Sequence, residues 1–92
     1  MEQPQDMPSL DDMKKLPPKE AIRLLSVFIS LHPADDEAFT IRGMKYWSLN
    51  MRKEAIGDYL KAIEINPSSR ARMALQFANS ILDYYNKDLL NP

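Results

Sequence analysis

One histidine and one run of acids are the side chains of this sequence best placed for chemistry. His32 is the only histidine, and a lone histidine can act as a general base or a metal ligand. It precedes Pro33 in the same way that Asn66 precedes Pro67. Because proline cannot continue a helix, we expect His32 to lie at a helix C-terminus and not in a catalytic or metal site.

The acidic run, residues 35–37, is the second candidate. Clustered carboxylates hold a cation when a glycine-centred loop rich in oxygen ligands presents them, and the sequence offers no such loop. Negative charge is favourable in the first turn of a helix, so we expect these acids to begin one. The sequence also lacks cysteine, a nucleophile with its base, and a glycine-rich phosphate loop. We therefore expect no enzymatic activity, no metal and no cofactor.

Composition narrows the choice of partners and location. The chain has 92 residues and a net charge of −1, with no basic stripe, so we expect one domain and no nucleic-acid partner. Its start, MEQPQDMPSLDDMKK, is acidic and interrupted by proline, unlike a signal peptide. No apolar run reaches the roughly 18 residues of a membrane span. A soluble cytoplasmic protein without membrane contact is the expectation.

An internal repeat organises the chain. Residues 20–33 read EAIRLLSVFISLHP and residues 54–67 read EAIGDYLKAIEINP. The identities between them include the opening Glu-Ala-Ile and the closing proline. A repeat of this period is typical of helical arrays in which each unit buries its apolar face on the next.

Apolar spacing predicts where the helices lie. We expect a short helix within residues 9–16, capped by Ser9, and longer ones at residues 18–31, from the acidic run to about Leu49, at 52–65 and at about 68–85. Residues 1–8 are expected to be disordered, residues 9–86 to form a single helical domain, and residues 87–92 to form a tail. The end of the chain, YYNKDLLNP, resembles the ends of small bacterial repeat proteins.

Residues 36–67 resemble one tetratricopeptide repeat (TPR). The positions that carry the resemblance are Phe39, Gly43, Tyr46, Ala55, Tyr59, Ala62 and Pro67. The resemblance implies an all-α, antiparallel helix-turn-helix array, a short right-handed solenoid of four main helices. Its units would be a half-repeat at 18–33, a full repeat at 34–67 and a capping helix at 68–85. Small residues at Gly43 and Ala55 would let two helices approach closely.

Two residues depart from the TPR pattern. Arg42 stands where an aliphatic residue is expected, just before the small Gly43. Phe77 stands where the last helix would have its small residue. Because a bulky side chain at that position blocks close packing of another helix, we expect stacking to stop there.

The resemblance also implies a place for a partner, since the first helix of each TPR pair lines the concave side that usually holds peptides. On this register the partner-binding residues would be Thr40, Met44, Trp47, Ala74 and Ala78. The TPR subtype that grips a terminal carboxylate uses Lys, Arg and Asn at these places, and Thr40, Met44 and Ala74 do not match. We therefore do not expect a carboxylate clamp. The alternative is that Met44 and Trp47 belong to the core.

The helix at 18–31 lacks a normal first helix to cover it. Its apolar face contains Leu24, Leu25, Phe28 and Ile29. Either the short segment at 9–16 docks on this face, or a second copy of the chain does. Two functional hypotheses follow. The concave groove suggests an adaptor that binds a short apolar peptide or helix, and the face of the helix at 18–31 suggests a self-association module that forms a homodimer.

Overall fold

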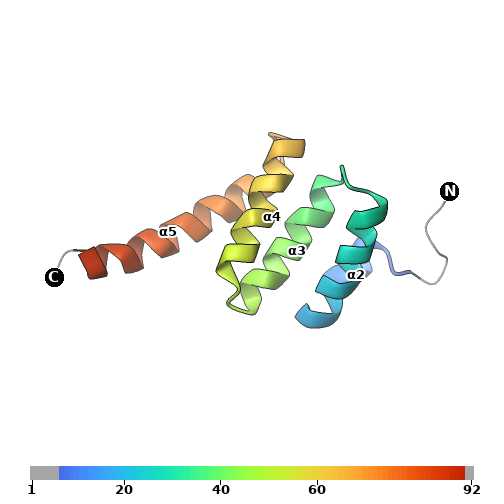
Figure 1. The fold of residues 1–92 in the computed structure, drawn as a ribbon, viewed down its shortest axis with the longest axis horizontal. Helices are drawn as coiled ribbons and strands as arrows, with labels where there is room; N and C mark the ends of the chain where they lie inside the picture. The colour runs from blue at the N-terminus through green and yellow to red at the C-terminus, as the bar shows by residue number, and fades with distance from the viewer. Residues whose placement is uncertain (1–6, 91–92) are drawn as a thin grey trace.

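The computed structural model describes residues 7–90, with side chains described as far as residue 83. Within this part of the chain the regular structure is α-helical and no strand is present. The helices are α1 (Leu10–Lys14), α2 (Pro18–Leu31), α3 (Asp36–Ser48), α4 (Arg52–Ile65) and α5 (Ala71–Leu90). In Figure 1, α2, α3 and α4 lie side by side with alternating direction, and α5 extends away from α4. The all-α prediction is confirmed.

Short polar side chains cap the starts of α1 and α3. The Ser9 hydroxyl accepts a hydrogen bond from the Asp12 amide at 3.2 Å, and the Asp35 carboxylate accepts one from the Ala38 amide at 3.0 Å. Each side chain satisfies an amide that the first turn leaves without a partner. The acidic run at 35–37 therefore begins α3, as the sequence predicted.

The C-terminal ends of α2 and α4 lie at equivalent positions of the sequence repeat. His32 is the C-cap of α2, and its amide donates to the Phe28 carbonyl at 2.8 Å. Asn66 is the C-cap of α4, and its amide donates to the Ala62 carbonyl at 2.9 Å. The expected place of His32 at a helix C-terminus is confirmed, and its ring packs against the Phe28 ring with centroids 4.5 Å apart.

The last helix differs from its expected bounds at both ends. α5 begins at Ala71 because the buried Ser69 hydroxyl accepts the Ala71 amide at 3.1 Å, which keeps residues 68–70 in a turn. It ends at Leu90, beyond the expected residue 85, since neither glycine nor proline interrupts the sequence before Pro92. Residues 1–6 of the expected disordered segment, and residues 91–92 of the expected tail, lie outside the described part of the chain.

Two apolar clusters form the interior. The N-terminal core joins α1, α2 and α3 and consists of Met13, Ala21, Leu25, Phe28, Ala38 and Ile41. The C-terminal core joins α3, α4 and α5 and consists of Phe39, Ala55, Tyr59, Ala62, Ala71 and Ala78. Ile29 packs against both cores. Most of the positions that carry the TPR resemblance are therefore buried, whereas Pro67, which follows the C-cap Asn66 of α4, is exposed.

Arg42, which departs from the TPR pattern, ties three helices together. Its guanidinium donates two hydrogen bonds of 2.8 Å to the Asp58 carboxylate of α4 and one of 3.0 Å to the Ser26 hydroxyl of α2. It also lies 5.6 Å from the ring centroids of Phe39 and Tyr46. Hydrogen bonding to Asp58 raises the pKa of Arg42 above its usual value. An aliphatic residue at this position could not make these contacts.

Candidate functional site

Helix α3 forms the floor of a surface made of two adjoining pockets, which we call the α3 groove. The apolar pocket, of about 250 Å³, is lined by Met44, Trp47, Tyr59, Ala74 and Phe77. The basic pocket, of about 290 Å³, is lined by Lys14, Ile41, Met44, Lys45, Ser48 and Arg70. Met44 lines both pockets and is 42% exposed. The groove therefore brings α1, α4 and α5 together around one helix.

An aromatic pair dominates the apolar pocket. The ring of Phe77 meets the ring of Trp47 nearly edge-on, with centroids 6.5 Å apart and an interplanar angle of 64°. Trp47 is partly buried, and the Arg52 guanidinium lies 4.9 Å from its ring centroid. Phe77 remains 60% exposed. Large apolar side chains that are only partly covered in this way are suited to contact a partner.

Tyr59 closes the apolar pocket from the α4 side. Its ring is buried among the residues of the C-terminal core. Burial, and then the negative charge of Asp58, raise the pKa of Tyr59 above its ordinary value.

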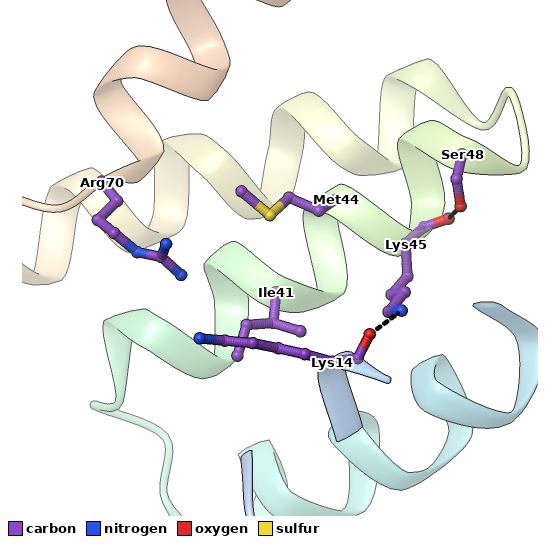
Figure 2. A pocket seen from close by; sticks show the side chains of 6 residues that line it. All are labelled: Lys14, Ile41, Met44, Lys45, Ser48 and Arg70. Carbon is purple, nitrogen blue, oxygen red and sulfur yellow. Dashed lines mark hydrogen bonds between the residues drawn. The ribbon is translucent and has the colours of Figure 1, made fainter. Parts of the chain in front are cut away.

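Lys45 lines the basic pocket and connects α3 to the end of α1. Its amine donates to the carbonyl oxygens of Lys14 and Leu16, the latter at 2.9 Å, so it caps the end of α1. Figure 2 shows the contact with Lys14, and shows Lys14 and Arg70 reaching towards the same space beside Ile41. The pocket thus has cations from three separate parts of the chain.

Glu37 pairs with two of these cations. Its carboxylate accepts hydrogen bonds from the Arg70 guanidinium through both oxygens, and one oxygen lies 4.0 Å from the Lys14 amine. Glu37 is in the first turn of α3, so a single carboxylate links the end of α1 to the turn before α5. All three side chains are partly exposed.

The five residues predicted to bind a partner fall into two groups in the structure, three that line a pocket and two that are buried. Met44, Trp47 and Ala74 line the apolar pocket, so the three come together as expected. Thr40 and Ala78 are buried and offer no surface to a partner. The Thr40 hydroxyl instead donates to the Asp36 carbonyl at 2.9 Å and lies 3.2 Å from the Ser69 hydroxyl, which explains its burial.

Sequence reasoning missed the other residues of the groove. Phe77 stood out only as a residue too large for further helix packing, which gave no sign that its ring turns towards Trp47. Lys14 is the last residue of α1 and Arg70 lies in the turn before α5. Only the folded chain brings them to the same pocket. No signal in the local sequence identified that pair.

The four residues considered for self-association are largely covered by their own chain. Leu25 and Phe28 are buried in the N-terminal core, and Leu24 and Ile29 are partly buried against it. The core that covers this face includes Met13 of α1, which is 0% exposed, together with Ala38 and Ile41 of α3. Of the two alternatives for covering this face, the structure contains the docked N-terminal segment.

A further pocket lies between α4 and α5. It is lined by Leu60, Ile63, Arg72, Leu75, Gln76 and Asn79 and has a volume of about 390 Å³. It contains no aromatic side chain and only one charged one. The α3 groove is therefore the better candidate for specific recognition, and Leu60, which is 53% exposed, provides a control position outside it.

Comparison with known proteins adds no assignment: no family model, curated protein or solved structure matches this chain. Among the described residues, no helix combines the length and the apolar character that crossing a membrane requires.

Proposed function

We propose that this chain is a non-enzymatic protein-interaction module that binds a short apolar peptide or helix in the α3 groove. In this proposal the helices form a TPR-like array, with α3 and α4 as the complete repeat, α2 as the half-repeat before it and α5 as the cap. The observation that carries the proposal is the apolar pocket, where the partly covered rings of Trp47 and Phe77 meet.

Energetics support this choice of surface. Aromatic anchors in small pockets often carry about 2 kcal/mol or more of binding free energy. Methionine adapts its shape to different apolar partners, and Met44 lies next to Trp47 in the same pocket. The alternative function, self-association through Leu24, Leu25, Phe28 and Ile29, has less support because α1 already covers much of that face.

Selection from a phage-displayed library of random peptides tests the proposal. Peptides recovered on the wild-type protein are synthesised, and their affinities are measured for wild type, Phe77→Ser and Leu60→Ser. Phe77 and Leu60 are exposed to a similar extent, so neither substitution removes core packing. We expect Phe77→Ser to weaken binding by about tenfold or more and Leu60→Ser to leave it unchanged. Equal losses in both variants, or an empty selection, would contradict the proposal.

A further inference from the structure

The charged side chains that line the α3 groove all have the same sign. Lys14, Lys45 and Arg70 line the basic pocket, and no acidic side chain does, although the whole chain has a net charge of −1. A pocket lined by one sign of charge attracts ligands of the opposite sign. The basic pocket adjoins the apolar pocket at Met44, so one ligand that crosses the groove meets both environments.

The contacts of these cations show what kind of anion fits. Lys45 already donates to two backbone carbonyls at the end of α1, whereas the charged groups of Lys14 and Arg70 lie beside carboxylates. Both pair with the side-chain carboxylate of Glu37. Asp11, which is almost fully exposed, also lies 3.5 Å from the Lys14 amine. A carboxylate on a side chain is therefore the group that this structure itself places between Lys14 and Arg70.

We propose that the partner of the α3 groove is a peptide segment with an acidic side chain close to a large apolar one. The apolar side chain enters the pocket formed by Met44, Trp47 and Phe77. The ligand's carboxylate pairs with Lys14 and Arg70 and competes with Glu37 for them. This inference rests on the proposed function, because it specifies the peptide that the groove binds.

Competition with Glu37 gives the inference a distinctive consequence. Replacing Lys14 or Arg70 with glutamine removes a cation that attracts the ligand, so affinity for an acidic peptide falls. Glu37→Gln removes the competing carboxylate, so affinity for the same peptide rises. Ion pairs this exposed contribute little, so we expect changes of about two- to fivefold in each direction, and smaller changes at high salt.

The test uses peptides recovered from the random phage-displayed library on the wild-type protein. One strong binder is synthesised in three forms: as selected, with its Asp and Glu changed to Asn and Gln, and with its C-terminus amidated. Affinities are measured for wild type, Lys14→Gln, Arg70→Gln and Glu37→Gln. Lys61→Gln is the matched control, because Lys61 is an exposed cation of α4 that lines neither pocket of the groove.

We expect the acidic peptide to bind more tightly than its Asn/Gln form. Its affinity should fall in Lys14→Gln and Arg70→Gln and rise in Glu37→Gln. Lys61→Gln and amidation of the peptide should leave the affinity unchanged. If the acidic and neutral forms bind equally and both need Phe77, the inference is overturned while the proposed function stands. Loss of binding on amidation would also overturn it, since the carboxylate would then be the terminal one. An empty selection would overturn the proposed function and the inference with it.

Discussion

Gly43 and Gly57 lie in neighbouring helices but in different surroundings. A Cβ atom added at Gly43 would lie 2.6 and 2.8 Å from ring atoms of Tyr59 and 3.1 Å from the Ala55 carbonyl oxygen, whereas one added at Gly57 would meet nothing within 4 Å. We predict that Gly57→Ala raises the free energy of unfolding by about 0.5–1 kcal/mol through helix propensity. Gly43→Ala should lower it by about 1–3 kcal/mol, because the crossing of α3 and α4 must widen.

Urea denaturation of the two glycine variants measures both effects. The larger Gly43→Leu is expected to destabilise the protein at least as much as Gly43→Ala. An unchanged midpoint for Gly43→Leu would show that the helices do not cross at this residue.

The Arg42–Asp58 pair is the second residue-scale prediction. Arg42→Met leaves the Asp58 carboxylate, which is only 9% exposed, without its guanidinium partner. We expect a loss of about 2 kcal/mol of unfolding free energy, less than for a fully buried pair because Arg42 is partly exposed. Asp58→Leu should cost a similar amount, and the double variant less than the sum, with a coupling of about 1–3 kcal/mol. Strict additivity in urea denaturation would show that the pair is not coupled.

The raised pKa of Tyr59 leads us to expect a loss of stability at alkaline pH. Its pKa is raised in the folded protein, so the unfolded chain ionises first as the pH rises past about 10. The stability that Tyr59 contributes is fully present below that pH and is lost above it, as the pH approaches the folded pKa. Tyr59→Phe cannot ionise, so its unfolding free energy should fall less steeply above about pH 10. Parallel pH profiles for the two proteins would contradict this.

At the scale of elements, the short helix α1 packs against α2 and α3 through the N-terminal core. Met13 is fully buried in the N-terminal core, whereas Met73 on α5 is 76% exposed. We predict that Met13→Ala lowers the free energy of unfolding by about 2 kcal/mol or more and that Met73→Ala changes it by less than about 0.5 kcal/mol. Thermal and urea unfolding measure both.

Removal of residues 1–16 should lower stability further or raise the solution mass, because the face of α2 would be uncovered.

The bounds of a helix can be predicted from the sequence where neighbouring residues set them, and less well where a contact between distant residues does. Helices α2 and α4 have the expected bounds because Pro18 begins one and the residues before Pro33 and Pro67 end both. Helix α5 begins at Ala71, a little after the expected start near residue 68. Ser69 accepts the Ala71 amide and is buried beside the Thr40 hydroxyl, and that second contact joins residues far apart in the chain.

The candidate site was predictable to a smaller extent, for the same physical reason. The TPR register placed Thr40, Met44 and Trp47 on the same side of the helix, and in the structure Met44 and Trp47 line the apolar pocket. Such a register does not show how deeply a neighbouring helix covers a face, so Thr40 was expected at the surface although it is buried. The basic pocket depends on the docking of α1 and on the turn before α5, which no local pattern encodes.

At the scale of the whole molecule, the chain is elongated. The principal extents are 55 × 27 × 17 Å and the radius of gyration is 14.5 Å, against about 12 Å for a compact domain of this length. Figure 1 shows the reason, since α5 extends away from the row formed by α2, α3 and α4. One side of α5 is therefore open, and its exposed Phe77 and Met73 remain available to a partner.

The state of association provides the whole-molecule prediction. The largest apolar side chains still exposed on α2 are Val27 and Leu31, each about half exposed, whereas Leu25 and Phe28 are buried. A stable dimer needs about 800 Å² of buried surface per partner, and on α2 only these two large apolar side chains are exposed. We therefore expect light scattering during gel filtration to give the monomer mass of 10.6 kDa, with the same value for Leu31→Glu. A dimer mass in the wild type that falls to the monomer mass in Leu31→Glu would instead establish self-association through α2. A dimer mass that persists in Leu31→Glu but falls in Phe77→Ser would place the second copy in the α3 groove.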